Sequence, residues 1–164
     1  MKSFIYILFF SFLFSNPSVS EIRELYKEAA NSREITQQLY AKLKGVKKTD
    51  NAVLVAYKGA SLILIAKNSK EKKNKKANFK KGIELLEYSI ARNPKNIELR
   101  FIRLTIQERA PKFLKYKNNI SEDTSLINDQ LKSVKNSNLQ ACIQEYVLQS
   151  NLFTIEEKNV ISKL

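Results

Sequence analysis

The sequence predicts an all-α protein of seven or eight helices that pack as consecutive antiparallel hairpins. Glycine and proline together number only six in 164 residues, which is too few for a turn-rich β protein. Apolar residues recur at spacings of three and four, as in Leu139, Cys142, Ile143, Tyr146 and Val147, and this is the period of a helix face. No segment alternates polar and apolar residues cleanly, as a half-buried strand would.

The first twenty residues, MKSFIYILFFSFLFSNPSVS, have the three parts of a secretory signal peptide. Lys2 supplies the positive start, residues 4–14 form the apolar run, and Ser18 and Ser20 are the small residues before a cut ahead of Glu21. The apolar run of eleven residues is too short to span a membrane. We therefore expect the segment to be removed and the protein to be periplasmic or secreted.

After this cut, residues 21–164 are expected to form a single domain with a net charge of +12 and no transmembrane span. Several of its helices begin at residues typical of helix N-termini. Thr154 stands three residues before Glu157, the spacing of a capping box, and Asn31 and Ser137 precede an acid or amide at the same spacing. Asp50 can cap the helix after it. Helices are expected near residues 21–30, 33–44, 51–67, 78–92, 96–109, 121–134, 138–149 and 154–163.

A lysine-rich segment interrupts this order at residues 67–77, KNSKEKKNKKA. It contains six lysines and one glutamate, and its only apolar side chain is Ala77. Such a composition predicts a solvated loop between two core helices.

The run at 78–96, NFKKGIELLEYSIARNPKN, resembles the second helix of a tetratricopeptide repeat. The aromatic, small, apolar and proline positions of that family fall on Phe79, Gly82, Ile83, Leu86, Ser89, Ile90 and Pro94. Its partner would be the helix at 51–67, where Gly59 supplies a small residue. Gly59 and Gly82 would let the two backbones approach closely. They stand 23 residues apart rather than the twelve of the usual repeat, so that the lysine-rich segment resembles an insertion of eleven.

The resemblance implies a short right-handed array of stacked helical hairpins, with the terminal hairpins at 21–44 and 138–163 as its caps. It also implies a scaffold that binds proteins and performs no catalysis. The chain as a whole resembles small exported helical-repeat proteins of Bacteroidota. Most stability is expected from the apolar helices at 51–67, 78–92 and 96–109.

Three polar residues of the helix at 96–109 depart from the repeat pattern. Arg100, Arg103 and Gln107 share one helix face and stand where a large aromatic, a leucine and a tyrosine are expected. Neither arginine has an acid three or four residues away, so each needs a partner from elsewhere. One interpretation is a fork that binds a carboxylate or phosphate of a ligand or partner.

The alternative interpretation of the two arginines is structural. They would pair with Glu84 or Glu87 across the hairpin, or donate to backbone carbonyls of the loop at 111–119. Networks of this kind are common in proteins, and the structural alternative is the favoured one.

The excess of lysine suggests a second kind of contact, with a polyanion. The candidate residues are Lys70, Lys72, Lys73, Lys75 and Lys76. Nucleic acid is disfavoured as the partner, because lysines outnumber arginines 23 to 6 and no aromatic residue interrupts the lysine run. Lipid headgroups, lipopolysaccharide or other anionic envelope components fit an exported protein better.

Composition argues against an enzyme. The chain has no histidine and a single cysteine, which removes the commonest general base and any zinc site built on several thiolates. No cofactor or metal site is expected, and Cys142 is expected to be a small buried hydrophobe. The leading hypothesis is a protein–protein interaction module with an unknown partner, contacting it through a groove lined by the helices at 51–67 and 96–109 or through the segment at 67–77. The alternative is a basic surface that binds anionic envelope components.

Overall fold

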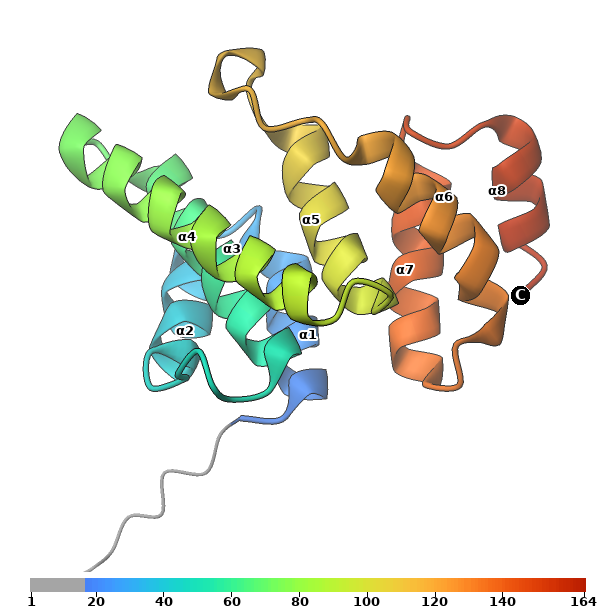
Figure 1. The fold of residues 1–164 in the computed structure, drawn as a ribbon, viewed down its shortest axis with the longest axis horizontal. Coiled ribbons are helices and arrows are strands. Elements are labelled where there is room, and N and C mark those ends of the chain that lie inside the picture. The colour runs from blue at the N-terminus through green and yellow to red at the C-terminus, as the bar shows by residue number, and fades with distance from the viewer. Residues whose placement is uncertain (1–16) are drawn as a thin grey trace, which may run out of the picture.

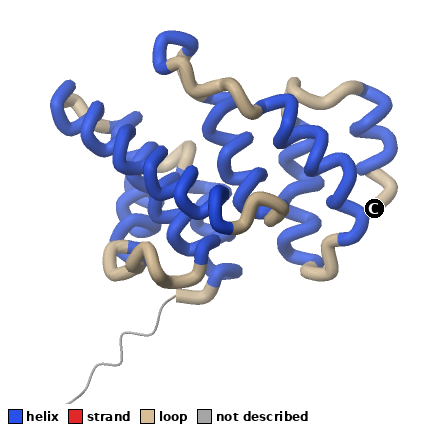
Figure 2. The backbone as a smooth tube through the Cα atoms, viewed as in Figure 1, coloured by secondary structure: helices blue, strands red, loops and turns tan. Residues whose placement is uncertain are grey.

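The computed structural model describes residues 17–164, and within them the chain forms eight α-helices and no strand (Figures 1 and 2). The helices are α1 (Val19–Ala29), α2 (Arg33–Leu43), α3 (Ala52–Asn68), α4 (Lys72–Arg92), α5 (Ile97–Arg109), α6 (Ile120–Gln130), α7 (Ser137–Gln149) and α8 (Ile155–Ile161). Two short 3-10 turns, Lys112–Leu114 and Leu131–Ser133, follow α5 and α6. The predicted all-α fold of seven or eight helices is confirmed. The apolar run at 4–14 lies outside the described residues.

Neighbouring helices in the chain contact each other in pairs: α1 with α2, α3 with α4, α5 with α6 and α7 with α8. Helix α5 lies in the middle of the molecule (Figure 1), and every residue from Ile97 to Gln107 is buried. On one side it meets α3 and α4, and on the other α6. None of the helices in the described part of the chain is long and apolar enough to cross a membrane.

The first and fourth helix pairs also touch each other. Arg23 of α1 donates a hydrogen bond to the side chain of Asn138 on α7, and Lys27 Nζ lies 3.0 Å from Glu145 Oε2. In an open array of hairpins these two pairs would be separated by the pairs between them. The contact from α1 to α7 therefore makes the molecule more closed than a simple linear stack.

The close approach of α3 and α4 that the glycines predict is confirmed. A Cβ atom added to Gly59 would lie 2.5 Å from the carbonyl oxygen of Gly82, and one added to Gly82 would lie 2.6 Å from the carbonyl oxygen of Gly59. Only glycine fits at either position without moving a backbone. This contact brings the apolar faces of the two longest helices together.

The predicted loop at 67–77 is wrong over most of its length. Helix α3 continues to Asn68 and α4 begins at Lys72, so that only residues 69–71 connect them. Lysine and alanine are good helix formers, and a helix already anchored on α3 gains one hydrogen bond for each residue it adds. The bond from Lys75 N to Glu71 O, at 2.9 Å, is the first of these. The exposed residues carry no apolar period, which is why the pattern did not reveal this extension.

Apart from α4, the helices begin within two residues of their predicted starts. The capping box of α8 is confirmed, because Thr154 Oγ1 accepts from Glu157 N at 3.2 Å and Glu157 Oε2 accepts from Thr154 N at 2.7 Å. At three other helices the cap is one residue away from the predicted one: Ser32 in place of Asn31, Asn51 in place of Asp50 and Asn136 in place of Ser137. The cap of α1 is Ser18, so a cut after Ser20 would remove it together with the first two helical residues.

Candidate functional site

An apolar groove lies between the second half of α3, the start of α4 and the end of α5, and it is bordered by the 3-10 turn after α5. Its volume is about 430 Å³. The main apolar wall residues are Ile63, Leu64, Phe79, Ile106, Phe113 and Leu114. The groove therefore lies between the two segments, 51–67 and 96–109, that the sequence analysis named as its lining.

The segment after α5 is held against the body and gives the groove its outer wall. Pro111 ends the helix, and Lys115 adopts a left-handed backbone conformation with φ 51° that turns the chain back. Tyr116 donates a hydrogen bond to Glu87, and its ring stands edge-on to Phe79 with centroids 6.4 Å apart. Phe113 at the tip of this segment stays 79% exposed.

All the charged residues that line the groove are cationic. Lys67, Lys75 and Arg109 border it, and no aspartate or glutamate does. Lys67 Nζ donates to the carbonyl oxygen of Ala30 at 3.0 Å, which fixes one of these charges in place. An apolar groove with a cationic rim favours an apolar occupant with negative charge beside it.

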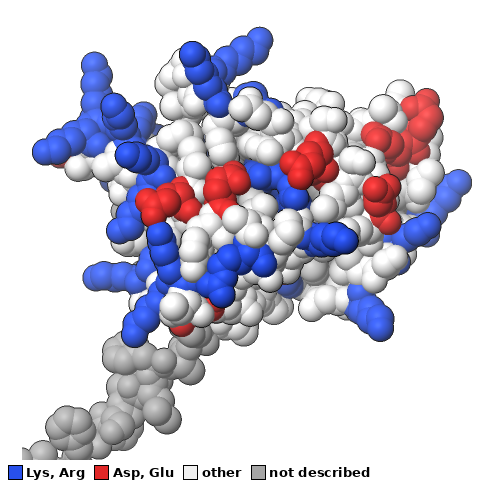
Figure 3. Space-filling view, viewed as in Figure 1, with Lys and Arg blue, Asp and Glu red and all other residues white. Residues whose placement is uncertain are grey.

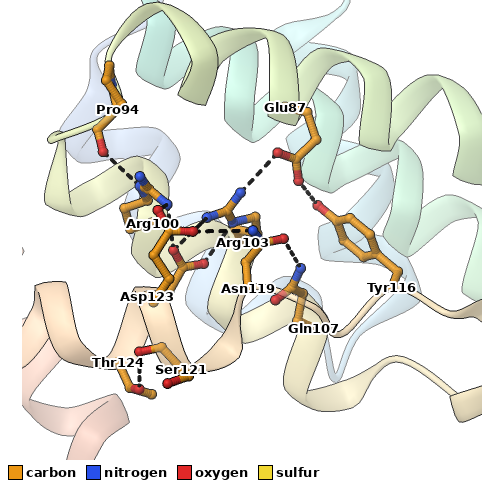
Figure 4. Close-up of polar contacts among 11 residues, drawn as sticks. Glu87, Pro94, Arg100, Arg103, Gln107, Tyr116, Asn119, Ser121, Asp123 and Thr124 are labelled. Atoms are coloured by element: carbon orange, nitrogen blue, oxygen red, sulfur yellow. Dashed lines mark hydrogen bonds and ion pairs between the residues drawn. The ribbon is translucent and has the colours of Figure 1, made fainter.

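Arg100 and Arg103 meet carboxylates of the same chain (Figure 4). Arg103 binds Asp123 in a bidentate manner, with Nε 2.7 Å from Oδ2 and Nη2 2.7 Å from Oδ1, and its Nη1 lies 3.0 Å from Glu87 Oε2. Arg100 Nη1 lies 3.0 Å from Asp123 Oδ1 and 2.7 Å from Glu122 Oε1, while its Nε donates to the carbonyl oxygen of Pro94 at 2.8 Å. Asp123 is fully buried. This geometry supports the structural interpretation of the two arginines.

The electrostatics of this arginine cluster favour its charged state. Burial works against the charge on Arg103, but the bonds from Asp123 and Glu87 outweigh it and raise the pKa of the guanidinium. Hydrogen bonds from Asn119 and Arg100 lower the pKa of Glu122. The cluster thus joins α4, α5 and α6 through two guanidinium groups and three carboxylates, each of which has an ionic partner.

Gln107, the third candidate of this face, lies at the edge of the cluster. It is fully buried, and its Nε2 donates to Asn119 Oδ1 at 3.3 Å. Its Oε1 has no hydrogen-bond partner among the described residues. The sequence named Glu87 as a partner of the arginines but not Asp123. Its buried role depends on how α6 folds back over α5.

A second buried ionic group was missed by sequence reasoning. Arg23 of α1 binds Glu98 of α5 with Nε–Oε1 and Nη2–Oε2 distances of 2.8 and 3.0 Å, and Tyr57 of α3 donates to the same carboxylate at 2.8 Å. Arg23 and Glu98 are 3% and 5% exposed. No sequence pattern predicts the contact between Arg23 and Glu98, because 75 residues separate them in the chain.

The candidate lysines lie at the start of α4 and in the connection before it. Lys70, Lys72, Lys73, Lys75 and Lys76 are all exposed, and Lys75 also lines the groove. The space-filling view shows this end of α4 as a cluster of basic side chains (Figure 3). The helix therefore brings together residues that were expected on a loop.

Cys142 is buried, as the sequence predicts. Burial raises the pKa of its thiol to about 11, which keeps the sulfur protonated and poorly nucleophilic at neutral pH. Within residues 17–164, no three or more of the histidine, cysteine, aspartate and glutamate side chains gather in a way that could hold a metal ion.

Comparison with known proteins found no family model, no curated protein and no solved structure that matches this chain.

Proposed function

We propose that this protein is an exported helical-repeat protein without enzymatic activity that serves as a protein–protein interaction module of the cell envelope. The observation that carries the proposal is the apolar groove between α3, α4 and α5, with its cationic rim. Export rests on the signal-peptide pattern of residues 1–20.

The occupant that suits this groove is a short apolar segment of a partner protein, flanked by acidic residues. Leu64 and Phe79 are only partly buried by the chain itself, so that a partner segment would cover them and gain the free energy of apolar burial. Lys67, Lys75 and Arg109 would then meet its carboxylates. A large aromatic at the rim, Phe113, has the exposure and position of a binding anchor.

The buried ionic groups support a scaffold rather than a catalyst. Arg23 is engaged by Glu98, and Arg103 by Asp123 and Glu87. These ions join helices to one another and do not face the groove, so they stabilise its walls without offering a group to a substrate.

A peptide-display selection on the purified protein tests the proposal. We expect the enriched sequences to contain clustered apolar residues next to aspartate or glutamate. Leu64→Gln should lower the affinity of the selected peptide for the protein roughly tenfold or more, since burial of one leucine contributes about 1.5–3 kcal/mol. Leu126→Gln is the matched control, because Leu126 is also a partly buried helical leucine but lies on α6 and does not line the groove.

Two results of the peptide experiment would count against this function. One is a selection that enriches no common sequence type. The other is a peptide whose affinity falls equally in both glutamine variants, since the loss would then reflect general destabilisation. If the groove binds a free fatty acid in preference to the selected peptides, its ligand is a small amphiphile and not a peptide. That result would also contradict the proposal.

A further inference from the structure

The first two turns of α4 present a row of lysines on an exposed face. Lys73, Lys76 and Lys80 stand at i, i+3 and i+7, so they lie on one stripe of the helix. All three are exposed. In the part of the chain that the structure describes, no lysine between residues 70 and 81 forms an ion pair with a carboxylate.

This row is electrostatically unfavourable in the isolated molecule. Like charges three and four residues apart repel one another, and cations near a helix N-terminus oppose the helix dipole. Helices α1, α2, α5, α6 and α8 each place an acid in the first turn, whereas α3, α4 and α7 have none there, and α4, whose N-cap is Glu71, begins with two lysines. An anionic partner would relieve both sources of repulsion.

A second, independent feature stands beside this row. Phe113 is 79% exposed, and it lies between the exposed Lys112 and Lys115. It borders the same groove as Lys75. Figure 1 shows the start of α4 and the segment after α5 as two projections from the same edge of the molecule. An exposed aromatic side chain flanked by lysines is typical of surfaces that enter the headgroup region of a bilayer.

We propose that this edge, made of Lys73, Lys76, Lys80, Lys112, Phe113 and Lys115, docks the protein onto the surface of an anionic lipid bilayer. The lysines meet the lipid phosphates, and Phe113 enters between the headgroups. A bilayer fits better than nucleic acid, because the basic groups of this edge are lysines, whereas the recognition of bases and phosphates favours arginine. The contact shares Phe113 with the peptide groove, but its five lysines do not line the groove.

Vesicle co-sedimentation tests this proposal. The purified protein is mixed with vesicles of phosphatidylcholine alone or of equal parts phosphatidylcholine and phosphatidylglycerol, over a series of salt concentrations. We expect binding only to the anionic vesicles and a steep loss with salt. The triple variant Lys73→Gln, Lys76→Gln, Lys80→Gln should bind roughly 10- to 100-fold more weakly. Glutamine keeps the helix propensity of lysine.

The control triple variant is Lys132→Gln, Lys135→Gln, Lys163→Gln, which removes the same charge from exposed positions in the C-terminal part of the chain. It should bind as the unaltered protein does. Phe113→Ser should weaken binding without changing its salt dependence. Its control is Ile155→Ser, at a side chain 74% exposed on α8, which should leave binding unchanged. Far-UV circular dichroism of each variant verifies that it is folded.

Three results would overturn the proposal: equal binding of the two triple variants, equal binding to both kinds of vesicle, or a lysine-dependent affinity for DNA or polyphosphate without binding to anionic vesicles. Because the lysine variants leave Leu64 and the groove walls unchanged, failure of their expected effect would not affect the peptide-binding function.

Discussion

Replacing Gly59 by alanine tests how α3 is held against α4. The added methyl group would lie 2.5 Å from Gly82 O and 3.0 Å from Leu86 N. Both are backbone atoms, so no side-chain rotation relieves the clash and the two helices have to separate. Overpacking of this kind costs about 1–3 kcal/mol, and alanine returns up to about 1 kcal/mol of helix propensity. We therefore expect a net loss of about 1–2 kcal/mol in the free energy of unfolding, or about 2–8 °C in Tm for a chain of this size.

The measurement is urea and thermal unfolding followed by far-UV circular dichroism, with Gly45→Ala as the control. Gly45 has no atom within 4 Å of an added Cβ, and its φ is not positive. Alanine there should leave stability unchanged or raise it by up to about 1 kcal/mol. The double variant Gly59→Ala, Gly82→Ala should lose less than the sum of the single losses, because either one already separates the helices. If Gly59→Ala and Gly45→Ala unfold at the same urea concentration, the close contact is not what positions α4.

Two further predictions concern the buried polar groups. Arg103→Ala should lower the free energy of unfolding by about 3–5 kcal/mol, because it leaves the buried carboxylate of Asp123 without its main partner. The control is Arg109→Ala, at an exposed arginine of the same helix, which should change the free energy of unfolding by less than about 0.5 kcal/mol. Equal unfolding midpoints of the two variants would contradict the structural role of Arg103. For Cys142, the folded pKa of about 11 exceeds the ordinary value of about 8.5, so the protonated thiol contributes stability that is present below about pH 8.5 and is lost as the pH rises toward 11. Between pH 8 and pH 10 the wild type should lose more stability than Cys142→Ala, because the buried tyrosines, whose pKa values are also raised, cause the remaining loss in both proteins. An equal decline in both would assign the whole loss to other groups.

The sequence was sufficient where local chemistry decides the structure. The start of α8 follows from Thr154 and Glu157 alone, since both partners of the capping box lie within one turn. The pairing of α3 with α4 was predictable because Gly59 and Gly82 are small residues within long apolar helices, and small residues there allow a close helix contact.

The start of α4 shows where sequence patterns fail. A lysine-rich segment has the composition of a solvated loop, and no local signal separates this from an exposed helix. The second half of α4 packs on α3, and the lysine-rich residues before it extend this anchored helix. The same limit applies to Asp123, whose partner Arg103 is 20 residues away in the chain.

The sequence by itself determined the helical class, most of the helix bounds, the close contact of α3 with α4 and the burial of Cys142, because each depends on spacing along one or two neighbouring helices. Only the tertiary structure decided which charges meet. Arg23 reaches Glu98, Arg100 and Arg103 of α5 reach Asp123, and α1 touches α7. Which charges meet depends on how whole helices pack against one another. Their burial also requires several helices to exclude water together, and the spacing of residues along one helix does not predict this.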